Sequence, residues 1–444
     1  MPSTDLRREV GVVGATALVV GHVIAVGIFL TPGAIIRTIA SPLGVMLLWS
    51  AMGALAICGA LCYGALAARY PEAGGGYVYL REVYGPSVAF LYGWQCLLIM
   101  DPGITAALAT GFAKYVDALV PLGDLSLRLV AIAAIGTFAI VHIGGVRIGA
   151  RVLNGVSFLK VALVAALMVG ALASTEGSWS HFEPLVARRD GAMPLGGAAA
   201  GGFVAAFFSF GGWWEVTRIA GEVRQPSRNV PRALLFGLLI VTVVYTTLTI
   251  AFLYLVPIER VSEGQAFATQ IGQAIMGRGG GTMVALVVIV CVLGSMAALQ
   301  MMAPRTYFAM ARDGALPSAI AVIDPRFGTP MRAIATQAAL ASIMVAVGTF
   351  ETIVAYFVFV AVVFLTATVA SVFVLRRRDP AFHVPGYPLT PSAFVAMGVM
   401  LLALLLASNP FQAVLGIGLV ALAIPVYRFV RPTAKIGGAG YRVI

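Results

Sequence analysis

Two apolar stretches of the sequence contain glycines where a helix in a bilayer would need an unbroken backbone. The first, VIAVGIFLTPG (residues 23–33), carries Gly27 followed by Pro32-Gly33, and the second, AAFFSFGGWWEV (residues 205–216), carries Gly211-Gly212. The hydrocarbon core holds no water that could hydrogen-bond unpaired backbone groups. Such a break is therefore either stabilised by neighbouring residues or used to bind a ligand. Freed N–H groups at a helix N-terminus attract carboxylates, and freed carbonyl groups attract ammonium ions. The two breaks together are suited to a zwitterion such as an amino acid.

The residues around both breaks are therefore the predicted binding site. They are Ile24, Ala25, Val26, Gly27, Ile28, Phe208, Ser209, Phe210 and Gly211, with Asp101 from a third segment. A single glycine could equally be a packing residue at a harmless kink. Two interrupted segments at matching places in two halves of a chain favour the functional interpretation.

Asp101 lies near the middle of the apolar segment YGWQCLLIMDPGITAAL, directly before Pro102. A charge at mid-membrane depth costs roughly 2.5–3.5 kcal/mol, so this carboxylate must be protonated or paired with a cation. The candidate partners are a substrate amine, Lys160 or a transported proton. The alternative is a neutral carboxyl group bonded to a backbone carbonyl.

Other ionisable residues also fall inside apolar segments. Lys160 lies nine residues beyond Arg151, roughly 13 Å along a helix at 1.5 Å per residue. His22 precedes the first break and could titrate near neutral pH, although a neutral, hydrogen-bonded histidine is the more common case. We predict proton coupling through His22, Asp101 and Lys160. Glu215 and Arg218 have the spacing of an ordinary i,i+3 pair, which could also form an inner gate.

The composition predicts an integral membrane protein with helical spans. Of 444 residues, 60% are hydrophobic and 11% are charged, whereas a soluble domain has roughly 25% charged residues. Runs near the ~20 residues needed to cross a bilayer occupy 11–36, 43–67, 87–112, 128–146, 152–173, 196–217, 233–256, 281–304, 333–349, 352–375, 392–408 and 411–430.

The net charge of +11 does not indicate a nucleic-acid partner, because most of the 29 Lys and Arg residues fall in alternate loops. The positive-inside rule then places both termini in the cytoplasm. Residues 1–10 have no signal-peptide pattern, and we expect the first span to be retained. The four cysteines fall inside spans and only four histidines occur, so no disulfide framework, metal site or cofactor is predicted.

The positions of the breaks predict an internal repeat. Helices 1–5 (about 11–173) and helices 6–10 (about 196–375) each begin with an interrupted span, and an odd number of spans makes the two repeats inverted. Helices 11 and 12 (about 392–430) complete a single transmembrane domain over 1–430, and 431–444 is a predicted cytoplasmic tail. The predicted fold class is an all-α polytopic membrane protein with a 5+5 inverted repeat and two additional C-terminal helices, twelve in total.

Several motifs make the chain recognisable. They are GIFLTPG, RYPEAGGGYVYLREVYGPSVAFLYGW, GEVRQPSRNVPRAL, APRTYFAMARDGALP and RRRDPAFHVPGYPLTP. With these motifs in order over nearly its whole length, the chain resembles the amino acid–polyamine–organocation transporters, particularly their bacterial L-type amino acid permease branch. The resemblance implies a leucine-transporter-like fold, with alternating access around a site between helices 1, 3, 6 and 8.

The resemblance also assigns roles to individual residues. It implies that the ammonium of Lys160 occupies the place of a sodium ion in sodium-coupled relatives, and helix 8 (GSMAALQMM) lacks the paired hydroxyls of a sodium site. It implies that Phe208 is an aromatic lid over the substrate. The chain departs from the family where Ala25-Val26-Gly27 replaces Gly-Ser-Gly, so two side chains crowd the amides expected to hold a carboxylate.

The function predicted from the sequence is therefore a sodium-independent secondary transporter of amino acids in the plasma (inner) membrane, by proton symport or exchange. The substrate is a small molecule, with neutral amino acids first. A cationic amino acid or polyamine transporter is the alternative, favoured by Asp101 and by the altered turn at Ala25-Val26. An intramembrane enzyme would need clustered catalytic groups, but His22, His142, Asp101 and Lys160 are scattered over four predicted helices. A channel would need polar faces on several helices, and the spans are polar only near the breaks.

Overall fold

The computed structural model describes residues 6–25, 27–189, 192, 194–261, 267–347, 350–408 and 410–430, and over these residues the chain is helical. No β-strand occurs in this part of the chain, where the only strand-like contact is an isolated parallel bridge between Val10 and Val223. A helix forms its backbone hydrogen bonds within one segment, which is why long apolar runs become helices rather than open sheets in hydrocarbon.

The first part of the chain forms α1 (Val12–Val23), α2 (Gly27–Ile39), α3 (Pro42–Arg69), α4 (Gly76–Tyr84), α5 (Pro86–Gln95), the π-helical turn η1 (Cys96–Met100), α6 (Asp101–Asp117), α7 (Asp124–Ile143), α8 (Val146–Leu172) and η2 (Trp179–Phe182). The second part forms α9 (Leu195–Phe210), the 3₁₀ segment η3 (Trp213–Glu222), α10 (Pro226–Leu255), η4 (Ile258–Arg260), α11 (Phe267–Met276), η5 (Gly277–Gly279), α12 (Gly280–Met302), α13 (Pro304–Arg312), η6 (Ser318–Ala321), α14 (Met331–Val347) and α15 (Phe350–Arg378). The last helices are α16 (Leu389–Ser408), α17 (Pro410–Ala421) and α18 (Ala423–Val430).

Helix lengths agree with a multi-pass membrane bundle. Within the described residues, 10 helical segments are long and apolar enough to cross a bilayer, and the bent pair α1–α2 would make 11. The predicted run 333–349 falls on α14, which has 17 residues and is shorter than the ~20 expected of a span. The predicted segment 431–444 lies outside the described residues.

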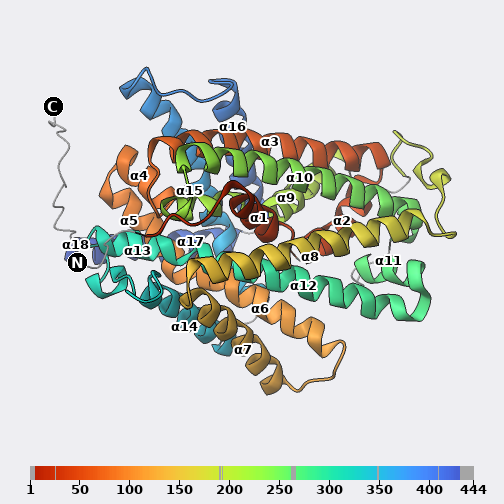
Figure 1. Cartoon of the computed structure of the whole chain (residues 1–444). Helices are drawn as coiled ribbons and strands as arrows, with labels where there is room; N and C mark the ends of the chain where they lie inside the picture. Colours follow the sequence, from red (N-terminus) through yellow and green to blue (C-terminus); the bar gives the residue numbers. More distant parts are fainter. Residues whose placement is uncertain are drawn as a thin grey trace.

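The long helices run side by side in one bundle (Figure 1). Helices α4, α13 and α18 lie at one end of it, the α13 end, and α11 lies at the other, the α11 end. Local signals start the helices: Ser41 caps α3 by accepting a hydrogen bond from Gly44 N, and Pro42 occupies its first turn.

The two interrupted segments lie in the interior of this bundle. Helix α1 contacts α8, α10, α12 and η3, and α2 contacts α9. Before α1, Val10 N donates to Glu222 O and Val10 O accepts from Arg224 N, at 3.0 and 2.8 Å. The start of the first broken segment is thereby fixed to the end of the second.

Candidate functional site

The first break separates α1, which ends at Val23, from α2, which begins at Gly27, and the two axes are bent by 51°. Gly27 is buried against the second broken segment, because a Cβ at this position would lie 3.1 Å from Ser209 Cα. Thr31 Oγ1 and Ser209 Oγ are 2.6 Å apart across the same contact. Val26, also predicted as a binding residue, lies outside the described residues.

The second break lies between α9 and η3. Gly211 leaves the helix with φ −57° and ψ 149°, and Gly212 has φ +97°, a conformation that residues with a Cβ rarely adopt. A Cβ on Gly212 would also lie 2.4 Å from His22 Cδ2. Two independent constraints therefore require glycine at 212, and both breaks meet at His22 and Ser209.

Lys160 reaches the first break from α8. Its side chain is fully buried, and Nζ donates to Gly21 O and Ile24 O, each at 2.6 Å, and to Ser295 Oγ at 3.1 Å. These carbonyl groups are at the C-terminal end of α1, where free carbonyls and the helix dipole favour a cation. Ser295 Oγ also lies 3.0 Å from Gly21 O, so the ammonium and one hydroxyl share the same carbonyl groups.

Tyr245 joins the two broken segments, a role that was not predicted from the sequence. Its buried hydroxyl lies 2.8 Å from Val23 O and 3.0 Å from Ser209 O, and can donate its proton to either. These oxygens belong to the last turns of α1 and α9. A tyrosine in the middle of an apolar segment was the available signal, since a buried phenol hydroxyl normally has a partner.

A cavity of about 380 Å³ lies between the breaks, α6, α12 and α15. Of the predicted site residues, those lining it are Ala25, Gly27, Phe208, Ser209, Gly211, His22 and Glu215. Its volume is in the range of small-molecule sites. The lining extends along α6 to Lys114 and Tyr115, near the end of that helix remote from α4.

Several predicted site residues do not line this cavity. They are Ile24, Ile28, Asp101, Phe210, Lys160 and Arg218. Ile24 and Ile28 are fully buried in the core, although Ile24 contributes its carbonyl group to Lys160. Phe210 packs against Trp49 and Tyr245, with ring centroids 6.0 and 5.2 Å away. A side chain beside a break can point into the core as readily as into the cavity.

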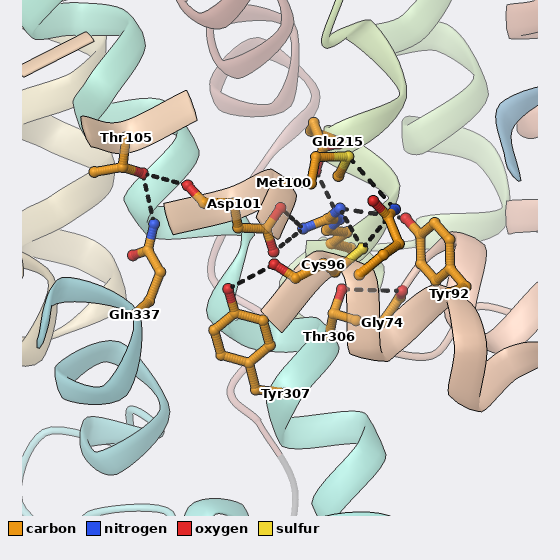
Figure 2. Close-up of polar contacts among 12 residues, drawn as sticks. Gly74, Tyr92, Cys96, Met100, Asp101, Thr105, Glu215, Thr306, Tyr307 and Gln337 are labelled. Atoms are coloured by element: carbon orange, nitrogen blue, oxygen red, sulfur yellow. Dashed lines mark hydrogen bonds and ion pairs between the residues drawn. The ribbon is translucent and has the colours of Figure 1, made fainter. Parts of the chain in front are cut away.

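Asp101 is paired with Arg218, which is not among the partners predicted from the sequence. Arg218 Nη1 lies 2.8 Å from both carboxylate oxygens of Asp101 and Arg218 Nη2 donates to Tyr92 Oη at 3.2 Å. Figure 2 shows Asp101, Glu215, Tyr92 and Cys96 gathered in one place. The predicted i,i+3 pair is also present, with Arg218 Nε 2.6 Å from Glu215 Oε2.

The π-helical turn η1 positions Asp101. The Asp101 N–H bonds Cys96 O, five residues back, so the helix is wider just before Pro102. Because Pro102 has no N–H and its ring crowds the preceding turn, a local widening relieves the clash. Asp101 O then accepts from Thr105 Oγ1 at 2.8 Å. Asp101-Pro102 was the sequence signal for this irregularity.

Further ion pairs lie between the cavity and the α13 end. Arg305 donates to both oxygens of Glu222, at 2.8 and 3.1 Å, and both side chains are buried. Arg81 Nη1 and Tyr77 Oη donate to Asp313 Oδ2 at 2.8 and 3.0 Å. Burial, together with the Asp313 carboxylate, raises the pKa of Tyr77 above its usual value. These contacts join η3 to α13 and α4 to the C-terminus of α13.

A family described as amino acid permease matches residues 10–426. The chain belongs to the amino acid permease family. It is similar to the serine/threonine exchanger SteT of Bacillus subtilis, at 29% identity over 95% of this chain and 96% of SteT. It is also similar to the b(0,+)-type amino acid transporter 1 of Mus musculus (28%; 92% and 84%) and the human cystine/glutamate transporter (26%; 95% and 85%).

Family membership confirms that the permease is a membrane transport protein and not an enzyme. In the described part of the chain, no three His, Cys, Asp or Glu residues are grouped so that they could hold a metal ion. The candidate site consists of backbone groups at two breaks, one buried lysine and a group of paired charges.

Proposed function

We propose that this permease is a sodium-independent secondary active transporter of amino acids, operating by proton symport or exchange. The observation that carries the proposal is the pair of helix breaks, which pack against each other beside a cavity and are joined through Ser209, His22 and Tyr245. Amides at the start of α2 suit the carboxylate of an amino acid. The C-terminal end of α9 suits its ammonium group, because Lys160 and Tyr245 already bind the last carbonyl groups of α1.

Lys160 supports the sodium-independent part of the proposal. Its ammonium holds Gly21 O and Ile24 O, where a bound cation would otherwise be needed. Proton coupling through His22, Asp101 and Lys160 is part of the proposal. We also propose that Phe208, which is 40% exposed and lines the cavity, is a lid over the substrate. The other predicted binding residues are proposed to contact the substrate.

The proposed mechanism is alternating access. The proposed architecture is a 5+5 inverted repeat followed by two further helices, all in one transmembrane domain. Both termini lie on the cytoplasmic side of the plasma membrane. In that orientation the α13 end is cytoplasmic. The ion pairs of Arg305, Arg81 and Arg218 would then form the closed inner side, and the cavity would extend outward along α6. Opening to the cytoplasm requires that these pairs separate, which makes Glu215 and Arg218 part of the inner gate.

Counterflow of a labelled panel of amino acids and amines in liposomes tests the proposal, with sodium replaced by choline. Saturable counterflow of an amino acid without sodium is the expected result. Flux without saturation or counterflow would indicate a channel, and the absence of any transported amino acid would contradict the proposal. Cationic amino acids and polyamines are the second candidate class, because a carboxylate, Glu215, lines the cavity.

A further inference from the structure

Glu215 is the acidic residue on the cavity wall, at the start of η3 directly after the second break. Its side chain is 2% exposed, and Oε2 accepts no hydrogen bond from the described residues. Oε2 lies 2.6 Å from Arg218 Nε, but that N–H is not directed at it. Glu215 is thus a buried carboxylate on the cavity wall whose ion-pair partner directs its hydrogen bonds to other residues.

Charge balance distinguishes Glu215 from its neighbour Asp101. Arg218 Nη1 is bonded to both oxygens of Asp101, and Nη2 to Tyr92 and Cys96. One guanidinium therefore serves two carboxylates, with the directed hydrogen bonds going to Asp101. A buried carboxylate needs a counter-charge, and Glu215 holds only a share of one.

The other buried cations do not supply that charge locally. Arg305 is bonded to Glu222, and the ammonium of Lys160 contacts two carbonyl oxygens and the Ser295 hydroxyl. Neither of these cations lines the cavity, and Lys114, which does line it, is an exposed residue in the last turn of α6, at the other end of that helix from Met100 and Asp101. A cation entering the cavity could approach Glu215 while leaving the Asp101–Arg218 pair intact.

The rest of the cavity wall suits an aliphatic stem. Most of the lining is apolar, and it includes Met100, Ile104, Leu108 and Val292. A basic amino acid has a carboxylate and an ammonium at one end, a methylene chain, and a second cation at the other. Long basic side chains bury their methylenes along apolar surface while the charged head finds a polar partner.

We propose that Glu215 is a specificity-determining residue that binds the side-chain cation of a basic amino acid, while Asp101 keeps Arg218 in place. This inference rests on the proposed function and adds the substrate class. The carboxylate of the substrate lies at the Gly27 end of the cavity, its stem along the apolar wall, and its terminal ammonium at Glu215. Asp101, which the sequence suggested as the substrate contact, acts through Arg218 as a positioning residue.

L-lysine and L-norleucine test this assignment, because they differ by the terminal ammonium group. Their apparent affinities are measured in sodium-free counterflow for the wild type, Glu215→Gln, Glu215→Asp and Glu259→Gln. Glu259 is an exposed carboxylate paired with Arg189, outside the cavity lining, and controls for loss of one negative charge. We expect Glu215→Gln to weaken lysine about tenfold or more relative to norleucine, as loss of one charged hydrogen bond implies.

The conservative variant and the control sharpen the result. Glu215→Asp should recover part of the lysine preference, and Glu259→Gln should leave the lysine-to-norleucine ratio unchanged. Equal losses for both substrates in Glu215→Gln, or no lysine counterflow by the wild type beside active norleucine counterflow, would overturn the inference and leave the proposed function standing. If the wild type exchanges no amino acid at all, the proposed function itself fails.

Discussion

Replacing Lys160 by alanine is the most direct test of how the first break is held. Nζ donates two hydrogen bonds of 2.6 Å to Gly21 O and Ile24 O, and a charged hydrogen bond contributes about 1.5–3 kcal/mol. Removing both therefore takes roughly 3–6 kcal/mol of interaction from the break. Part of this is offset, because the cost of burying an ammonium group also disappears.

A net loss of about 3 kcal/mol in the transport transition state corresponds to a roughly hundredfold slower turnover. The protein should stay folded, because Ser295 Oγ, 3.0 Å from Gly21 O, still reaches one of the freed carbonyl groups. Lys160→Met keeps most of the stem and isolates the ammonium. Arg151→Ala, which removes an exposed cation from the same helix, is the matched control.

The assay is the initial rate of counterflow per unit of reconstituted protein, with size-exclusion chromatography as the check of folding. Wild-type uptake should be the same in sodium and in choline at fixed ionic strength and pH. Strong stimulation of the wild type by sodium, or near-normal turnover of a folded Lys160→Ala protein, would refute the reasoning.

Three further predictions concern the breaks and their supports. Gly27→Leu should abolish substrate binding, because even a Cβ there would lie 3.1 Å from Ser209 Cα; normal binding would make Gly27 a packing residue only. Asp101→Asn should lower the free energy of unfolding by less than the roughly 3–5 kcal/mol that an unpaired buried charge costs, because Arg218 keeps a second carboxylate partner. In competition assays it should weaken the binding of cationic substrates more than that of neutral ones. Tyr245→Phe should cost about 1–3 kcal/mol of stability through an unpaired carbonyl group and slow counterflow, and an unchanged melting curve and rate would contradict a bridging role.

Much of the architecture could be predicted from the sequence. Hydropathy depends on one segment at a time, so the membrane class, the positions of the long helices and the family motifs follow from the order of residues. The break at Gly211-Gly212 was equally visible, because positive φ at Gly212 is a local requirement that glycine meets. Lys160 stood out because a charge in an apolar segment is costly wherever the helix is placed.

The partners of those residues were decided by tertiary structure. Asp101 and Arg218 are 117 positions apart, and their contact depends on the rotation of α6 and η3 and on the widened turn η1. Tyr245 bridges Val23 and Ser209 only because α10 packs against both broken segments. Hydropathy shows that a buried charge needs a counter-charge, but only the packing of helices distant in sequence selects which residue provides it. The same packing turns Asp101 away from the cavity and leaves Glu215 on its wall.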